Sequence, residues 1–325
     1  MPEPARTAAD ILSGLGLPAA DLNELPSSAA RFPDGSQYRV EIPSTEGPDC
    51  LRAVFEEADK LGVPVHRVSQ GSGVFLLTDA ELDDMAGLAA ERHAEVSLFA
   101  RPTAGWGPSA MAMAPAGAAS AAAVRGTGQL AAALDDVCRA AAHGYRSVLV
   151  SDIGLLAAFG QARSRGLLPA DMQAKVSVML PVANPAAARL VTELGAGTLN
   201  IPTDLTLGQI AGLRSVTDIP LDIYVEAPDN LGGFLRHHEI PELIRIAAPV
   251  YLKFGLRNAP DIYPSGSHLS ATAVALSRER VRRARLGLDL LQRSGVTGVS
   301  HPPAESAGLA VPRAESVFQQ SARAE

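Results

Sequence analysis

Residues 175–202, KVSVMLPVANPAAARLVTELGAGTLNIP, hold the pattern that decides the fold. A short β-branched run (175–181) leads into a stretch with apolar residues at helical spacing, which ends near Gly195. A second β-branched run follows at 198–202. Because glycine commonly follows the end of a helix, these residues predict one strand–helix–strand unit.

The same unit recurs along the chain from residue 36. Strand-like runs start at residues 38, 64, 95, 147, 175, 198, 221 and 249, so successive starts are 26, 31, 52, 28, 23, 23 and 28 residues apart. Strands that alternate with helices at this pitch pair in parallel through right-handed crossovers. Eight units predict an α/β fold, a (β/α)8 TIM-type barrel in a single domain. A doubly wound open sheet is the alternative, but neither GxGxxG nor GxxxxGK[ST] occurs to favour a nucleotide-binding fold.

The remaining segments divide the chain around this barrel. The 52-residue spacing contains an Ala-rich insertion at about 104–126, either a mobile surface segment or a lid that closes Trp106, Met111 and Met113 over a ligand. The polar composition of the last residues, 298–325, predicts disorder. We therefore expect an N-terminal arm (1–35), the barrel (36–297) and a disordered tail (298–325).

Composition and charge exclude several classes of protein. A net charge of −7 does not favour nucleic-acid binding. Two cysteines, Cys50 and Cys138, are too few for a disulfide framework or a cluster held by four thiolates, and both are expected in the core. The sequence shows neither a secretory signal nor a membrane-spanning run, so we expect a cytoplasmic protein without membrane partners. An acidic barrel with an Arg-rich last helix could form a homo-oligomer.

Polar residues follow the predicted strands where a barrel places its catalytic groups. As catalytic residues we predict Glu226, Lys253, His268 and Asp152. As substrate-binding residues we predict Glu41, Gln70, Arg101, Trp106, Asn184, Asn200, Asp204, Arg257, Asn258 and Tyr263.

Lys253 and Glu226 are the most telling of these residues, because a buried charge must be paired or shift its pKa. Lys253 could pair with Glu226, bind an anion, or act as a Schiff-base amine. Glu41, Asp152, Glu226 and His268 could together form an oxygen-rich divalent metal site. His66 is expected to have a structural role.

One part of the chain resembles a known family. VLVSDIGLL (148–156) and VSVMLPVANPAAARLVTELGAGTLNIPTDLTLGQI (176–210) resemble the collagenase-like peptidase family 32 of unassigned catalytic type. The resemblance implies a barrel core and site-facing positions at Asp152, Asn184 and the Thr203–Asp204 segment. Several family members hold an iron–sulfur cluster with cysteines after the seventh strand. The corresponding stretch here (222–242) contains no cysteine, so we expect no such cluster.

Three hypotheses about function follow. The resemblance favours a peptidase-like hydrolase of small or peptide substrates, in which Glu226 or His268 activates water. A metal- or lysine-dependent isomerase, epimerase or lyase of small sugars or sugar acids is the second, with Lys253 as the amine. A non-catalytic barrel scaffold is the third.

Overall fold

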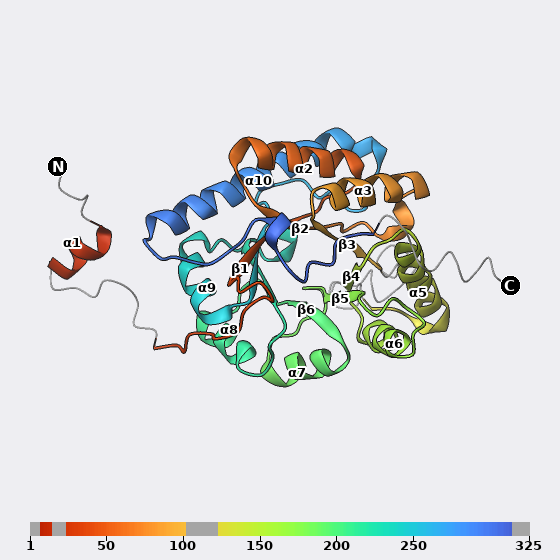
Figure 1. The fold of residues 1–325 in the computed structure, drawn as a ribbon, viewed down its shortest axis with the longest axis horizontal. Helices are drawn as coiled ribbons and strands as arrows, with labels where there is room; N and C mark the ends of the chain where they lie inside the picture. The colour runs from red at the N-terminus through yellow and green to blue at the C-terminus, as the bar shows by residue number, and fades with distance from the viewer. Residues whose placement is uncertain (1–6, 15–23, 102–122, 314–325) are drawn as a thin grey trace.

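The computed structural model describes residues 7–14, 24–101 and 123–313. Within these ranges eight parallel strands close into a barrel in chain order, which confirms the predicted (β/α)8 fold (Figure 1). The strands are β1 (Tyr38–Pro43), β2 (Val65–Ser69), β3 (Glu95–Phe99), β4 (Ser147–Val150), β5 (Gln173–Val176), β6 (Ala196–Asn200), β7 (Leu221–Glu226) and β8 (Val250–Phe254).

Helices surround the barrel, and the long last helix lies beside the first helix of the barrel (Figure 1). They are α2 (Pro48–Leu61), α3 (Asp79–Glu91), α5 (Gly126–Ala142), α6 (Ile153–Ser164), α7 (Pro185–Glu193), α8 (Leu207–Arg214), α9 (Ile240–Ala247) and α10 (Ser270–Arg293). The N-terminal segment contains α1 (Ala8–Gly14). Short 3-10 turns are η1 (Val74–Leu76), η4 (Asp229–Leu231), η5 (His237–Glu239), η6 (Ser267–Leu269) and η7 (Pro303–Glu305).

The strands alternate in character along their length. Aliphatic residues such as Val40 and Ile42 belong to the hydrophobic core. The intervening positions carry buried charged side chains, which is unusual because parallel strands covered on both faces are mostly apolar. These buried charges are Arg39, Glu41, Arg67, Glu95, Lys175, Asp222 and Lys253. The barrel interior is therefore an ionic network, and it leads directly to the candidate site.

Residues 24–35 of the predicted arm lie against the barrel end where the strands begin. The Ser28 N–H donates to the Arg245 carbonyl at 2.8 Å. Phe32 is buried and its ring meets the Tyr251 ring edge-on, with centroids 5.2 Å apart. The arm thus adds apolar cover to the amino-terminal end of the barrel.

The predicted disorder of the tail is wrong for residues 298–313. The Gln37 N–H donates to the Val299 carbonyl at 2.7 Å, and the Arg313 N–H donates to the Gly144 carbonyl at 2.9 Å. The Ala310 N–H donates to a carboxylate oxygen of Glu95 at 3.3 Å. Hydrogen bonds to fixed barrel groups order this polar segment, although its composition alone does not favour order. Residues 314–325 lie outside the described ranges.

His66 ties the tail to the first two strands, in agreement with its predicted structural role. The Val40 N–H donates to Nδ1 at 3.1 Å, and Nε2 lies 2.8 Å from the His301 carbonyl oxygen. These contacts require the neutral ring with its proton on Nε2. Burial lowers the pKa of His66 to about 4.

We therefore expect His66 to make the fold sensitive to acid. Because the unfolded chain binds this proton more readily, the associated stability is complete above about pH 6.5 and falls as the pH drops toward 4. The loss should reach about 3 kcal/mol. Urea unfolding of the wild type and of His66→Asn across this pH range measures it. Equal pH dependence in the two proteins would contradict this role for His66.

Several other predictions concern the surface. Cys50 is buried on α2 as predicted, but Cys138 on α5 is exposed, because it lies on the solvent side of that helix. Nearly all of the predicted insertion, with Trp106, Met111 and Met113, falls outside the described residues. Among the helices that the structure describes, none is long and apolar enough to cross a membrane.

Candidate active site

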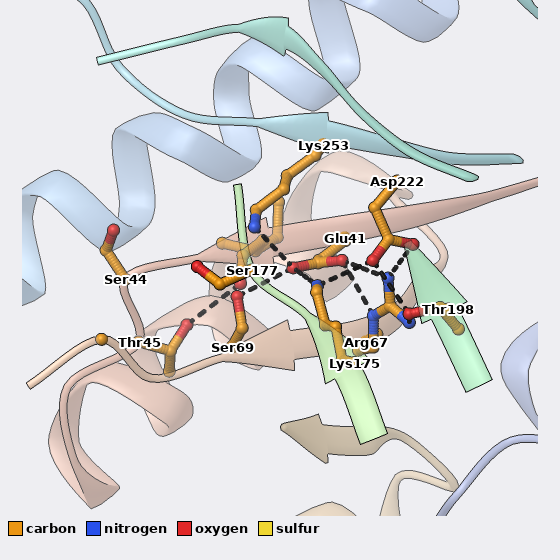
Figure 2. A network of polar contacts seen from close by, with 12 residues as sticks. Glu41, Ser44, Thr45, Arg67, Ser69, Lys175, Ser177, Thr198, Asp222 and Lys253 are labelled. Atoms are coloured by element: carbon orange, nitrogen blue, oxygen red, sulfur yellow. Dashed lines mark hydrogen bonds and ion pairs between the residues drawn. The ribbon is translucent and has the colours of Figure 1, made fainter. Parts of the chain in front are cut away.

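The Glu41 carboxylate is the centre of the ionic network inside the barrel (Figure 2). Its Oε2 accepts from Nε and Nη2 of Arg67 at 2.8 and 2.5 Å. Its Oε1 accepts from Ser69 Oγ at 2.8 Å and from the Lys175 ammonium, and lies 3.3 Å from Lys253 Nζ. Burial raises the pKa of Glu41, but the three cations more than offset this and hold it well below its usual range. Glu41 is therefore ionised at neutral pH.

Strand register explains why these groups meet. Glu41 on β1 is the direct partner of Arg67 on β2 and of Lys253 on β8. Side chains opposite one another on paired strands lie within reach of an ion pair. Lys253 therefore pairs with Glu41 rather than with Glu226, so the pairing with Glu226, one of three roles considered for Lys253, is wrong.

Asp222 supplies a second carboxylate. One of its oxygens pairs with the Arg67 guanidinium. The other accepts from Thr198 Oγ1 at 3.0 Å and lies 3.4 Å from Lys175 Nζ. Glu95, closer to the strand starts, lies 3.6 Å from Arg67. Glu41 and Asp222 are therefore each shared between cations and a hydroxyl group.

The protonated form of Lys175 is destabilised by its surroundings. Burial, together with the nearby Arg67 cation, lowers the pKa of Lys175 to about 7, although Asp222 and Glu41 act in the opposite direction. An amine with this pKa can gain or lose a proton at neutral pH, which ordinary lysines do not. Lys175 can therefore act as a proton acceptor within the site.

Tyr224 and Asn200 also contact the Lys253 amine. Its Nζ is 4.5 Å from the centroid of the Tyr224 ring. In the amide orientation that satisfies both hydrogen bonds of Asn200, Oδ1 lies 3.0 Å from Lys253 Nζ and Nδ2 donates to the Asp222 carbonyl at 3.1 Å. A carboxylate, an amide oxygen and an aromatic face thus fix the position of this amine.

A cavity opens above Lys253 at the carboxyl ends of the strands. Its volume is about 370 Å³, within the usual range for small-molecule sites. Its wall includes Ser69, Gln70, Arg101, Asn200, Tyr224, Lys253 and Tyr263. Lys175 does not belong to this wall. Of the two amines beside Glu41, Lys253 is therefore the one that faces the cavity.

The choice of lysine at these positions is itself informative. The sequence has three lysines among its 28 basic residues, and two of them are Lys175 and Lys253. The third, Lys60, is exposed on α2. Arginine cannot lose its proton in proteins, whereas a buried lysine can. The chain thus places two of its three lysines in the barrel interior, next to one carboxylate oxygen.

Six of the predicted site residues meet at this cavity. Lys253, Gln70, Arg101, Asn200 and Tyr263 line it, and Glu41 lies directly beneath Lys253. Tyr263 also donates its hydroxyl hydrogen bond to Ser44 Oγ.

Glu226 lies away from the cavity despite being buried. The register of β7 against β8 shifts between Tyr224 and Glu226. Glu226 therefore does not continue the row of side chains, such as Asp222, that point into the barrel. Its Oε1 accepts the Arg257 N–H at 2.8 Å. Its Oε2 lies 3.8 Å from His237 Nε2 and 3.8 Å from Arg283 Nε. This carboxylate contacts the loop after β8 and the helical layer.

Two other residues that were predicted for the site cap the first turns of helices. Asp152 accepts the Leu155 N–H at 2.9 Å at the start of α6, and also the Val124 N–H at 2.9 Å. Asn184 accepts the Ala187 N–H at 3.0 Å at the start of α7. These are helix N-caps, a role that Asp and Asn commonly fill.

The remaining predicted residues lie at the surface. Asp204 and His268 are exposed. Arg257 and Asn258 both contact Asp229, through the Arg257 side chain at 2.9 Å and the Asn258 N–H at 2.5 Å. None of these four lines the cavity above Lys253 within the described ranges. Trp106 lies outside those ranges.

The structure does not bring together the four residues predicted as metal ligands. Glu41 contacts cations inside the barrel, Asp152 caps α6, Glu226 contacts the loop after β8, and His268 is exposed. Among residues 7–14, 24–101 and 123–313, no group of three or more His, Cys, Asp or Glu could hold a metal ion.

Sequence reasoning missed Arg67, Lys175 and Asp222. The site residues were predicted mainly at the ends of strands, whereas these three residues lie within strands. The available signal is a charge at alternate positions of an otherwise apolar run, as in YRVEIP (38–43), with Arg39 and Glu41, or LDIYVE (221–226), with Asp222 and Glu226.

Comparison with known proteins adds little beyond these observations. No protein-family model and no curated protein matches the chain. Among solved structures, the U32 peptidase Mk0906 is 17% identical, with a TM-score of 0.37 over 63% of this chain and 73% of that one. A truncated 3-deoxy-D-arabino-heptulosonate 7-phosphate synthase from Thermotoga maritima is 14% identical, with a TM-score of 0.42 over 81% and 90%. A dimeric Rubisco from Hyperthermus butylicus is 11% identical, with a TM-score of 0.43 over 86% and 72%. Such low similarity does not assign the chain to a family.

Proposed function

We propose that this protein is an enzyme in which Lys253 forms a Schiff base with a small carbonyl compound, as in a lyase, isomerase or epimerase of small sugars or sugar acids. One observation carries the proposal: the Lys253 amine faces a cavity while a second amine, Lys175, contacts the same carboxylate oxygen. Lysine nucleophiles require a site that allows the neutral amine at working pH.

The chemistry follows from these groups. The neutral Lys253 amine attacks the carbonyl carbon to form a carbinolamine. The proton released earlier by the Lys253 ammonium returns to the hydroxyl group of this adduct, which leaves as water and gives a protonated imine. The imine withdraws electrons from the neighbouring carbon, so that a proton or a carbon fragment leaves that carbon more readily. Reversal of the first steps, with water added back, releases the product and the free amine.

Glu41 and Lys175 can accept the proton that the Lys253 ammonium loses. The Lys253 ammonium must lose a proton before it attacks, and Glu41 Oε1 lies between it and Lys175 in the network. Lys175, which is half deprotonated near pH 7, can accept that proton through Glu41. The role of Lys175 is positioning and proton transfer, since it does not line the cavity.

A hydrolytic mechanism receives less support from the same geometry. Water activation by Glu226 or His268 beside Lys253 requires one of them in the cavity wall, and neither is among the described residues there. For this reason we favour the amine of Lys253 over the peptidase-like chemistry that the sequence resemblance implies.

Reduction of the imine by borohydride tests the proposal. The protein is incubated with pyruvate, dihydroxyacetone phosphate or glycolaldehyde, treated with sodium borohydride, and weighed intact by mass spectrometry. Hydride addition converts the imine to a stable secondary amine, so we expect one added group per chain with at least one compound. Failure of all three to label the wild type above a denatured sample would overturn the proposal.

The pH dependence of trapping tests the role of Lys175. In the wild type, the labelling rate should rise between pH 6 and 8, because deprotonation of Lys175 near pH 7 creates the proton acceptor. In Lys175→Met this rise should disappear, and labelling at pH 8 should be about tenfold slower than in the wild type. A rise of the same size in the variant would show that Lys175 does not take part.

A further inference from the structure

We propose that Tyr224 is a catalytic residue of this site, whose hydroxyl group donates a hydrogen bond to the carbonyl oxygen of the substrate as the Lys253 amine attacks. This inference rests on the proposed function, because it takes Lys253 as the attacking amine. It adds the group that stabilises the negative charge formed on that oxygen.

Strand pairing places the Tyr224 ring beside the reactive amine. Tyr224 on β7 is the direct partner of Lys253 on β8, so the two side chains lie on the same face of the sheet. Lys253 Nζ lies 4.5 Å from the centroid of the Tyr224 ring, and both residues line the cavity. A carbonyl compound bound to this amine therefore lies next to Tyr224.

The hydroxyl group of Tyr224 is available to a ligand. Tyr224 is only 6% exposed, yet its hydroxyl has no hydrogen-bond partner within the part of the chain that the structure describes. Buried phenol groups usually find a partner. Tyr145 donates to the Leu82 carbonyl at 2.7 Å, and Tyr251 accepts from Arg39 Nη1 at 3.3 Å. Because Tyr224 lines the cavity, we assign its missing partner to the substrate.

Other hydroxyl groups of the cavity wall already donate to the protein. Ser69 donates to Glu41 at 2.8 Å, and Tyr263 donates to Ser44. A substrate would have to displace these contacts to accept from either group. Tyr224 can donate to a substrate without giving up an existing hydrogen bond to a described residue.

Gly255 and Lys253 hold the Tyr224 ring in position. A Cβ at Gly255 would lie 3.2 Å from Cε1 of this ring and 2.6 Å from the Glu226 carbonyl oxygen, so the lack of a side chain at Gly255 makes room for the ring. The Lys253 amine lies over the ring, where a cation is attracted to the aromatic face. The donor is thus oriented before a substrate binds, as efficient catalysis requires.

Burial also keeps the Tyr224 hydroxyl protonated. Removal from water raises the pKa of Tyr224 above its ordinary value of about 10, and the negative charge of Glu41 acts in the same direction. The group is therefore a neutral phenol at the pH near 7 at which Lys175 titrates. A phenol can donate a hydrogen bond, whereas a phenolate cannot.

The attack on the carbonyl carbon requires such a donor. As the bond between nitrogen and carbon forms, an electron pair of the C=O bond moves to the oxygen. This oxygen carries negative charge until a proton passes to it from the nitrogen and gives the carbinolamine. A hydrogen bond from Tyr224 stabilises that charge most strongly in the transition state, and Tyr224 keeps its own proton throughout.

Replacement of Tyr224 by phenylalanine tests the inference, because it removes only the hydroxyl group. Borohydride trapping is measured over a range of concentrations with whichever of pyruvate, dihydroxyacetone phosphate and glycolaldehyde labels the wild type fastest. The maximal labelling rate should fall about 100-fold, whereas the concentration that gives half of this rate should change less than about threefold. The melting temperature should match that of the wild type, because no hydrogen bond to a described residue is lost.

Tyr251→Phe is the matched control. Tyr251 is also buried on a barrel strand, but its hydroxyl contacts Arg39 and it does not line the cavity. This variant should melt at a lower temperature than the wild type and should be labelled at the wild-type rate.

The outcomes separate this inference from the proposed function. Labelling of Tyr224→Phe at the wild-type rate would overturn the inference and leave the function standing. A Tyr224→Phe protein that melts well below the wild type would show that the hydroxyl supports the fold, and would also overturn the inference. If none of the three compounds labels the wild type, the proposed function fails and the inference fails with it.

Discussion

Replacement of Glu41 by glutamine is expected to lower the free energy of unfolding by about 3–5 kcal/mol. The carboxylate contacts Arg67, Lys175 and Lys253, and all three side chains are almost completely buried. Glutamine has nearly the same shape, but it removes the charge and turns an amide N–H₂ toward these donors. Removal of one partner of a buried ion pair is costly because the remaining charges have no access to water.

Urea unfolding at pH 7 measures this effect, with Glu56→Gln as the matched control. Glu56 pairs with Arg278 at the surface, and its side chain is 61% exposed. Exposed pairs typically contribute less than about 1 kcal/mol, so the control should unfold almost as the wild type does. A Glu41→Gln protein as stable as this control would contradict the charge network.

Replacement of Lys253 by methionine is expected to abolish borohydride-trapped labelling, with a rate reduced by about 100-fold or more, because a held amine reacts far faster than one in solution. The fold should survive this change. Glu41 keeps Arg67 and Lys175, and the interior then holds one cation fewer to desolvate.

Lys60→Met is the control for Lys253→Met. Lys60 is exposed on α2 and pairs with Glu57 at 3.2 Å, so its loss should leave labelling unchanged. The rate of intact-mass increase and the melting temperature are measured for both variants. Labelling of a folded Lys253→Met protein at the wild-type rate would contradict the role of Lys253.

The fold was largely predictable because its determinants are local. Eight apolar runs separated by helical stretches predict a barrel without knowledge of the side chains inside it. The tail was not predictable for the opposite reason. Val299, Ala310 and Arg313 are held by hydrogen bonds to groups far away in sequence, and polar composition does not reveal such partners.

The candidate site was predictable only in part. Strand ends identified Lys253, Arg101 and Asn200, since a barrel gathers its strand ends at one face. The same reasoning placed Glu226 in the site, but a register shift after Tyr224 directs that carboxylate elsewhere. A one-residue change of register reverses the face of a side chain, and a single sequence gives no sign of it.

Lys175 and Asp222 required three-dimensional proximity to be recognised. Each is a charge within a largely apolar strand, and its role follows only from its neighbours across the barrel. Lys175 and Glu41 are separated by 134 residues in sequence but share a hydrogen bond.

Identification of the labelled lysine tests whether Lys253 is the reactive amine. After borohydride trapping, the protein is digested and the modified residue is located by tandem mass spectrometry, which has three lysines to distinguish. We expect the reduced adduct on Lys253, with Lys175 and Lys60 unmodified. An adduct on Lys175 or Lys60, with Lys253 unmodified, would contradict it.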